Sequence, residues 1–208
     1  MNRISVFLLA IVAFVPFSTH AQLTEAQRPV WLQGDTWEYV RENGTTSKVE
    51  VTEVTNSGYR VLMTNSKGYK GVSLYDLDIN LIESSSGQVI SPKAEYFRWP
   101  LRVGEPYAGG DYTYAHSRKA GVTVVGKHVI KSITSETITV KAGTFDTLKI
   151  KSEYQYRYQD GTFANEADLT RWYAPAVRRW VKNQYYDHGA ANPSMSEYEL
   201  VRFVPAKK

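Results

Sequence analysis

The clearest pattern along the chain is an alternation of side-chain character between residues 148 and 159. The even-numbered positions are mostly apolar or aromatic: Leu148, Ile150, Ser152, Tyr154, Tyr156 and Tyr158. The odd-numbered positions are all charged or amide side chains. Because successive side chains of a strand point to opposite faces, this pattern predicts an antiparallel strand with one covered face and one wet face. Its twelve residues would reach about 40 Å, roughly twice an ordinary strand, so the strand is expected to bend.

Short strand-like segments of the same kind fill most of the chain. Thr137 to Lys141 is expected to pair with the long strand, joined through Ala142-Gly143-Thr144, in which Gly143 suits a positive φ angle. Further strands are predicted at residues 36–42, 47–55, 59–65, 71–75, 78–82, 111–118, 122–133, 169–173, 177–186 and 196–204. Turn-forming pairs such as Asn43-Gly44 and Asp160-Gly161 separate them. Helical periodicity is almost absent, and one helical turn is expected at residues 163–168.

This arrangement predicts an all-β fold: a single antiparallel meander in one strongly curved sheet or half-open β-barrel. Residues 97–104, which include Pro100, are expected to cross between an N-terminal and a C-terminal group of strands. Residues 22–208 are predicted to form a single all-β domain, with little helix apart from a signal peptide in residues 1–21.

The signal peptide is inferred from Arg3, the apolar residues 4–17, and the small or short residues Thr19 and Ala21 before the expected cleavage point. A membrane anchor would need roughly 20 apolar residues, more than this stretch provides. No later segment is apolar enough to cross a membrane, and no cysteine is present for lipid attachment. The protein is therefore expected to be exported as a soluble protein, to the periplasm or, alternatively, outside the cell.

Three segments resemble a family of exported bacterial domains of unknown function. They are residues 31–39 (Trp-Leu-Gln-Gly-Asp-Thr-Trp-Glu-Tyr), residues 139–150 (Thr-Val-Lys-Ala-Gly-Thr-Phe-Asp-Thr-Leu-Lys-Ile) and residues 171–177 (Arg-Trp-Tyr-Ala-Pro-Ala-Val) with Val181-Lys182. The resemblance implies a curved antiparallel sheet in a bacterial envelope protein, and it supplies no catalytic residue. The chain departs from the family pattern at Lys141, where proline is more usual, and at Arg178-Arg179, where small or apolar residues with a glycine are common. Both departures are expected on wet surfaces.

Composition excludes several kinds of site. Without cysteine the chain has no disulfide, thiolate nucleophile or cysteine metal site. The mild net charge of +4 is spread along the chain, which argues against nucleic-acid binding. His116, His128 and His188 lack metal-ligand spacing, and neither a Gly-x-Ser-x-Gly nucleophile motif nor a phosphate-binding glycine loop occurs. No enzymatic activity and no cofactor are expected; a hydrolase built on two carboxylates is the weaker alternative.

The aromatic content is the feature most suggestive of function, with 5 Trp, 15 Tyr and 7 Phe. Three consecutive inward tyrosines bring hydroxyls that need partners if buried, which favours a partly wet groove over a dry core. The candidate ligand-binding residues are Trp37, Tyr39, Trp99, Tyr154, Tyr156, Tyr158, Trp172, Tyr173 and Trp180. Core packing and cross-strand aromatic pairs are the alternative interpretation of the same residues.

Two functional hypotheses follow from these observations. The first is a non-catalytic binding module for a hydrophobic or amphipathic ligand such as a lipid, glycolipid or glycan. The second is a structural or assembly protein that docks another envelope protein by strand addition. The basic and aromatic segment 171–182 could contact anionic headgroups or polysaccharide, or it could be an edge strand protected by its charges.

Overall fold

The computed structural model describes residues 22–117, 119–189 and 194–207, so the expected signal peptide lies outside the described residues. The N-terminal group of strands comprises β2 (Thr36–Arg41), β3 (Thr46–Thr55), β4 (Gly58–Asn65), β5 (Lys70–Asp76) and β6 (Leu81–Glu83). The C-terminal group comprises β8 (Tyr107–Ala115), β9 (Thr123–Val140), β10 (Gly143–Tyr158), β11 (Phe163–Ala174), β12 (Arg179–Asp187) and β13 (Ser194–Val204). Two short strands, β1 (Glu25–Ala26) and β7 (Leu101–Arg102), pair with each other, and the 3-10 turn η1 (Pro175–Val177) precedes β12.

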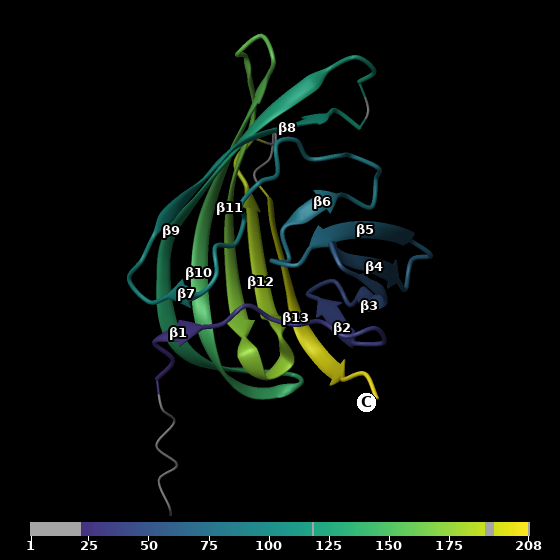
Figure 1. Cartoon of the computed structure of the whole chain (residues 1–208), viewed down its shortest axis with the longest axis vertical. Helices are drawn as coiled ribbons and strands as arrows, with labels where there is room; N and C mark the ends of the chain where they lie inside the picture. Colours follow the sequence, from purple (N-terminus) through teal and green to yellow (C-terminus); the bar gives the residue numbers. More distant parts are fainter. Residues whose placement is uncertain (1–21, 118, 190–193, 208) are drawn as a thin grey trace, which may run out of the picture.

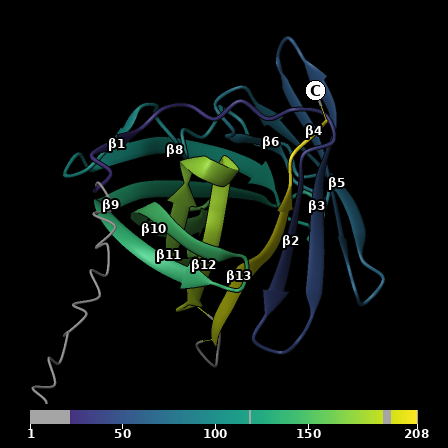
Figure 2. The ribbon, with the colours of Figure 1, turned by 90° about the horizontal axis from the view of Figure 1, so that it is seen from below.

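The eleven longer strands form one antiparallel sheet in the order β6-β5-β4-β3-β2-β13-β12-β11-β10-β9-β8. The all-β, strongly curved sheet expected from the sequence is confirmed. Seen from its end, the sheet wraps from β8 round to β13 and continues through β2 to β6 (Figure 2). None of the described residues forms a helix of the length and apolar character required to cross a bilayer.

The path of the chain through the sheet differs from the expected single meander. Each group of strands is a meander by itself, but the two groups are joined by β13 pairing with β2, through contacts such as Leu200 opposite Tyr39. The edges of the sheet are β6 and β8, which are separated in the chain only by the two-residue strand β7 yet lie at opposite ends of the strand order. The chain must cross from one edge to the other between them (Figure 1).

Several boundaries also differ from those expected. The predicted strands 122–133 and 137–141 are one strand, β9, which pairs with β10 along its length. The helical turn expected at residues 163–168 is wrong, because these residues extend β11 and pair with β10, with Asp168 opposite Glu153. Ladder hydrogen bonds to a long neighbour thus outweigh the weak strand propensity of a polar segment. The strand expected at 78–82 begins only at Leu81, since residues 76–80 form a turn in which the Ile79 N–H donates to the Asp76 carbonyl at 3.0 Å.

The core lies on the concave side of the sheet and contains two tryptophans that are fully buried. The indole of Trp31 donates to the Arg178 carbonyl at 2.8 Å, and that of Trp37 donates to the Val177 carbonyl at 2.8 Å. A buried indole N–H needs such an acceptor. The first and third segments of the family resemblance therefore meet in space, and their aromatic residues hold η1 against β2.

Residues 84–106, here called the crossing segment, connect the two edges of the sheet. At the β6 edge, Val89 forms a bridge with Glu83. At the β8 edge, Ser91 and Thr113 exchange backbone hydrogen bonds of 2.9 and 2.7 Å. The crossing segment therefore occupies backbone groups of both edge strands and lies over the interior of the curve.

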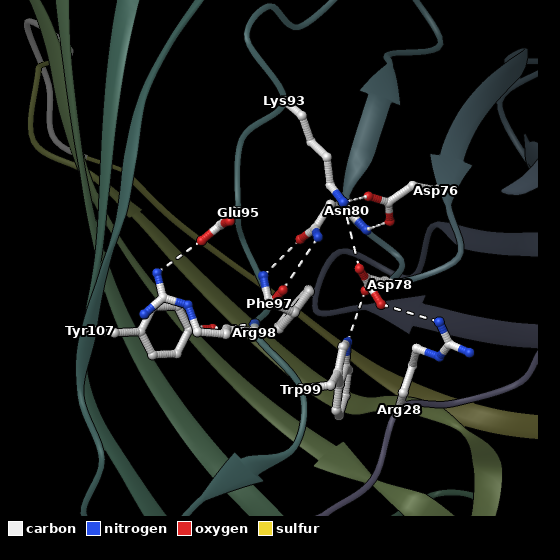
Figure 3. A network of polar contacts seen from close by, with 10 residues as sticks. All are labelled: Arg28, Asp76, Asp78, Asn80, Lys93, Glu95, Phe97, Arg98, Trp99 and Tyr107. Atoms are coloured by element: carbon white, nitrogen blue, oxygen red, sulfur yellow. Dashed lines mark hydrogen bonds and ion pairs between the residues drawn. The ribbon is translucent and has the colours of Figure 1, made fainter. Parts of the chain in front are cut away.

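A polar network fixes this segment to the turn at residues 76–80 (Figure 3). The Asn80 side chain accepts from the Phe97 N–H at 2.7 Å and donates to the Phe97 carbonyl at 3.3 Å. The Trp99 indole donates to the Asp78 carbonyl at 2.8 Å, and Lys93 forms an ion pair with Asp76. Asn80 is 1% exposed, so its two hydrogen bonds are made out of reach of water.

We expect Asn80→Ala to lower the free energy of unfolding by about 1–3 kcal/mol, because it leaves the buried Phe97 N–H and carbonyl without partners. Chemical denaturation followed by circular dichroism measures this change. Asn56→Ala, in the exposed turn between β3 and β4, is the matched control and should change stability by no more than about 0.5 kcal/mol. Equal losses in the two variants would contradict the role assigned to Asn80.

Candidate functional site

Three adjoining cavities lie along the concave face of the sheet. The inner cavity has a volume of about 400 Å³ and lies between strands β10 to β13 and the crossing segment with β5 and β6. It is lined by Arg41, Tyr75, Ile79, Leu81, Tyr96, Phe97, Tyr154, Tyr156, Leu169, Arg171, Trp180, Asn183, Tyr185, Ser196 and Tyr198. Its floor is thus apolar and aromatic, and its charged groups are arginines.

The arginine cavity, of about 250 Å³, continues from the inner cavity toward β2 to β5. It is lined by Tyr39, Arg41, Ser47, Val49, Met63, Tyr75, Arg171, Arg179, Trp180 and Tyr198. Five of these residues also line the inner cavity, so the two spaces are neighbours. Its lining combines three arginines with three tyrosines and no carboxylate.

The outer cavity, of about 580 Å³, lies on the other side of the inner cavity. It is lined by Tyr114, His116, Ser117, Lys119, Val124, Tyr156, Tyr158, Ala164, Asn165, Tyr185, Asp187 and Gly189. Tyr156 and Tyr185 belong to both linings. The inner and outer cavities each have a volume in the size range of small-molecule sites, and the arginine cavity extends the hollow that they form.

The tyrosine row of β10 lies along this hollow. Tyr154 and Tyr156 line the inner cavity with their rings stacked at 6.3 Å between centroids, and Tyr158 lines the outer one. Tyr154 is 4% exposed, and its hydroxyl lies beside the side chains of Arg171 and Ser152. Burial raises the pKa of Tyr154 and of Tyr156 above the ordinary value, so both stay neutral and keep a proton to donate.

The other candidate residues are divided between this hollow and the core. Tyr39 and Trp180 line the arginine cavity, and the Tyr39 hydroxyl donates to the Trp180 carbonyl at 2.9 Å. Trp99 lines a separate space of about 220 Å³ beside the crossing segment, and Tyr173 packs against it with ring centroids 5.2 Å apart. Trp37 is 0% exposed and packs in the core.

Trp172 lies on the opposite face from the hollow. It stands opposite Lys149 in the β10–β11 ladder, and its ring lies beneath the ammonium groups of Lys149 and Lys182, 5.1 and 5.4 Å from them. Its indole donates to Glu136 at 3.3 Å. Trp172 is thus covered by charged side chains of the convex face and lines none of the three cavities.

Two arginines that were not among the candidate residues also line the site. Arg179 was expected on a wet surface, and this expectation is wrong, because the residue is 5% exposed. Its guanidinium carbon lies 5.0 Å from the ring centre of Trp31, 5.1 Å from that of Trp37 and 4.7 Å from that of Trp180. These rings form a cation–π enclosure that compensates part of the cost of taking the charge out of water.

Arg171 lies on the same face, one strand away. Its guanidinium carbon is 4.7 Å from the ring centre of Trp180 and 5.5 Å from that of Phe97. β11 and β12 are central strands of the sheet, so the interpretation of segment 171–182 as an exposed edge strand is wrong. Burial raises the pKa of Tyr198, and Arg171 and Arg179 oppose that rise because a nearby cation favours the ionised phenol.

His128 and His188 lie in different surroundings. His188 contacts Asp168 at 2.8 Å between Nε2 and Oδ2, whereas His128 is 1% exposed inside the sheet. Among the described residues, no three His, Asp or Glu side chains gather as metal ligands would.

Comparison with known proteins gives a likeness of fold only. No protein-family model matches the chain, and no curated protein matches it in sequence. Among solved structures, two described as "putative" are similar to it: a lipoprotein of Parabacteroides distasonis (TM-score 0.44, 15% identity, 86% of this chain and 99% of that one) and an exported protein with YmcC-like fold of Bacteroides fragilis (0.41, 16%, 86% and 99%). The hypothetical lipoprotein YmcC of Escherichia coli is also similar (0.44, 11%, 84% and 87%). Likeness at this level says nothing about what the present chain binds.

Segment 171–182 was expected to contact anionic headgroups or polysaccharide or to form an exposed edge strand, and neither expectation placed Arg171 and Arg179 inside a cavity, because charge by itself suggests exposure. The sequence contained one local indication for Arg171. Arg171 and Tyr173 are two residues apart, so in a strand they lie on the same face. Burial of Arg179 had no such indication, since it depends on Trp31 and Trp37 arriving from the other group of strands.

Proposed function

We propose that this chain is a non-catalytic binding module that holds an amphipathic small molecule in the hollow of its curved sheet. Its place of action would be outside the cytoplasm, in keeping with the signal peptide expected in residues 1–21. The proposal depends on one observation: three adjoining cavities line the concave face, and tyrosine hydroxyls and arginines project into them from an apolar floor. Apolar walls with a few convergent polar groups are typical of sites for molecules with both characters.

The alternative, docking of an envelope protein by strand addition, has less support. Strand addition requires an edge with free backbone groups. The β6 edge carries a bridge from Val89 to Glu83, and the β8 edge carries the paired hydrogen bonds between Ser91 and Thr113. The crossing segment thus already occupies part of each edge of the sheet.

Titration with the neutral fluorophore N-phenyl-1-naphthylamine tests the proposal. We expect a saturable rise in its fluorescence with the full chain. Tyr156→Ala should weaken binding about tenfold, because Tyr156 contributes to two of the cavities. Ser196→Trp should abolish binding, because it places an indole in the inner cavity without removing a core residue.

Tyr186→Ala is the matched control, since Tyr186 neighbours the cavity-lining Tyr185 but points to the opposite face and is 38% exposed. It should bind the fluorophore as the wild type does. Circular dichroism confirms that each variant folds. Absence of saturable binding to the wild type, or undiminished binding to folded Ser196→Trp, would refute the proposal.

A further inference from the structure

The arginine cavity contains a buried cation, Arg179, which forms no ion pair with a carboxylate of the residues that the structure describes. Arg179 is 5% exposed, and its Nε and Nη1 atoms have no hydrogen-bond partner. Aromatic rings cover the faces of its guanidinium group, and the Tyr39 hydroxyl lies beside its side chain, but Nε and Nη1 are left without an acceptor. Leaving such donors unsatisfied away from water is costly, and each such group calls for an explanation.

A second arginine repeats this arrangement beside the first. The buried Nε of Arg171 also lacks a partner, although the Tyr154 hydroxyl lies beside its side chain. Arg41 adds a third cation at the exposed margin of the same cavity. No carboxylate of the described residues forms an ion pair with Arg41, Arg171 or Arg179. By contrast, Arg178, which directly precedes Arg179, is paired with Asp35 at 2.7 Å.

A hydroxyl beside the arginines is suited to the same task. Tyr198 lines the cavity, and burial raises its pKa, so it remains a protonated donor, whereas the Tyr39 hydroxyl already donates to the Trp180 carbonyl at 2.9 Å. Guanidinium and phenol groups that converge on a space without a carboxylate form a site for an oxyanion, which accepts charge-assisted hydrogen bonds.

Given the proposed function, on which this inference rests, we infer that the ligand is an amphipath with an anionic head, a carboxylate or a phosphate, seated between Arg171 and Arg179. The rest of the molecule extends into the inner cavity, which shares Arg171 and Trp180 with the arginine cavity and continues over Ile79, Leu81 and Leu169. The anion supplies the acceptors that the two guanidinium groups lack.

Displacement of N-phenyl-1-naphthylamine by ten-carbon amphipaths tests the inference on the full chain. We expect decanoate or decyl phosphate to displace the fluorophore at a concentration about tenfold or more below that of decan-1-ol, because a charge-assisted hydrogen bond to the head contributes at least that factor. The order of decanoate and decyl phosphate shows which oxyanion the cavity prefers. Trp180, which contacts both arginines, should report the anion by a change in tryptophan fluorescence that decan-1-ol does not cause.

Arg171→Met should remove the advantage of the anions and leave decan-1-ol unaffected. Arg179→Lys is the second variant, because it keeps a cation in the cavity but loses the planar donors, and it should reduce the advantage severalfold. Arg202→Met, at an exposed position of β13, is the control and should bind as the wild type. Equal displacement by decanoate, decyl phosphate and decan-1-ol, or an unchanged anion preference in folded Arg171→Met, would overturn the inference while leaving the binding function intact. Failure of the neutral fluorophore to bind would overturn both.

Discussion

Acidification from pH 7 to pH 4.5 is expected to lower the free energy of unfolding by about 2–3 kcal/mol through His128 alone. His128 lies inside the sheet between the rings of Tyr96 and Tyr154, with the backbone of Glu95 beside its imidazole. Burial, with a smaller contribution from the charge of Arg171, lowers the pKa of His128 from 6.5 to about 3. The folded protein therefore holds this histidine neutral over a range in which the unfolded chain protonates it.

The direction of the effect follows from proton binding. Between pH 6.5 and about 3 the unfolded state binds the proton and the folded state does not, so falling pH favours unfolding. The stability is fully present above pH 6.5 and declines by about 1.4 kcal/mol per pH unit below it. Carboxylates with lowered pKa, such as Glu136 and Glu197, add a further acid sensitivity that is common to the variants compared.

Denaturant unfolding of the wild type and of His128→Phe, each at pH 7 and pH 4.5, measures this contribution. The variant keeps a planar ring in the site but cannot titrate, so its loss of stability on acidification should be smaller by about 2–3 kcal/mol. Asn56→Ala, in the exposed turn between β3 and β4, is the control, because it removes no titratable group, and this variant should keep the wild-type dependence. Identical pH dependence in wild type and His128→Phe would show that the buried histidine has no part in acid unfolding.

Replacement of Asp35 by alanine is expected to cost about 3–5 kcal/mol of stability, the range for breaking a buried ion pair. Asp35 is 0% exposed and accepts three hydrogen bonds: 2.7 Å from Arg178 Nη2, 2.8 Å from the Leu32 N–H and 3.0 Å from the Ala206 N–H. One carboxylate thus joins the segment before β2, the residue after η1 and the segment after β13. Its removal leaves a partly buried cation and two backbone donors without their acceptor.

Thermal and denaturant unfolding of Asp35→Ala provides the test, with Glu53→Ala as the control. Glu53 pairs with Arg60 at 3.1 Å, but both side chains are about half exposed, and its loss should cost less than about 1 kcal/mol. The double variant Asp35→Ala/Arg178→Met should be more stable than the sum of the single losses predicts, since the two groups interact directly. A loss of under about 1 kcal/mol in Asp35→Ala would contradict the structural role of the pair.

The local pattern predicted which face of β10 carries the tyrosines that line the hollow. Alternation along β10 places Tyr154, Tyr156 and Tyr158 on one face. On that face, Tyr154 and Tyr156 line the inner cavity, and Tyr158 lines the outer cavity. Trp37 and Trp172, candidates on the same reasoning, line none of these cavities. An aromatic side chain is expected to be covered by something other than water. Its type does not show whether a ligand, the core or a lysine side chain covers it.

The sequence by itself determined the all-β class, most of the strands and the face on which each β10 side chain lies. These properties depend on side-chain period and turn chemistry, which act over a few residues. Only the tertiary structure decided that β13 pairs with β2, that the crossing segment lies over the interior, and that Arg179 is buried among Trp31, Trp37 and Trp180. Those arrangements join residues as much as about 170 positions apart along the chain. They depend on which faces can be buried together, and no local pattern contains that information.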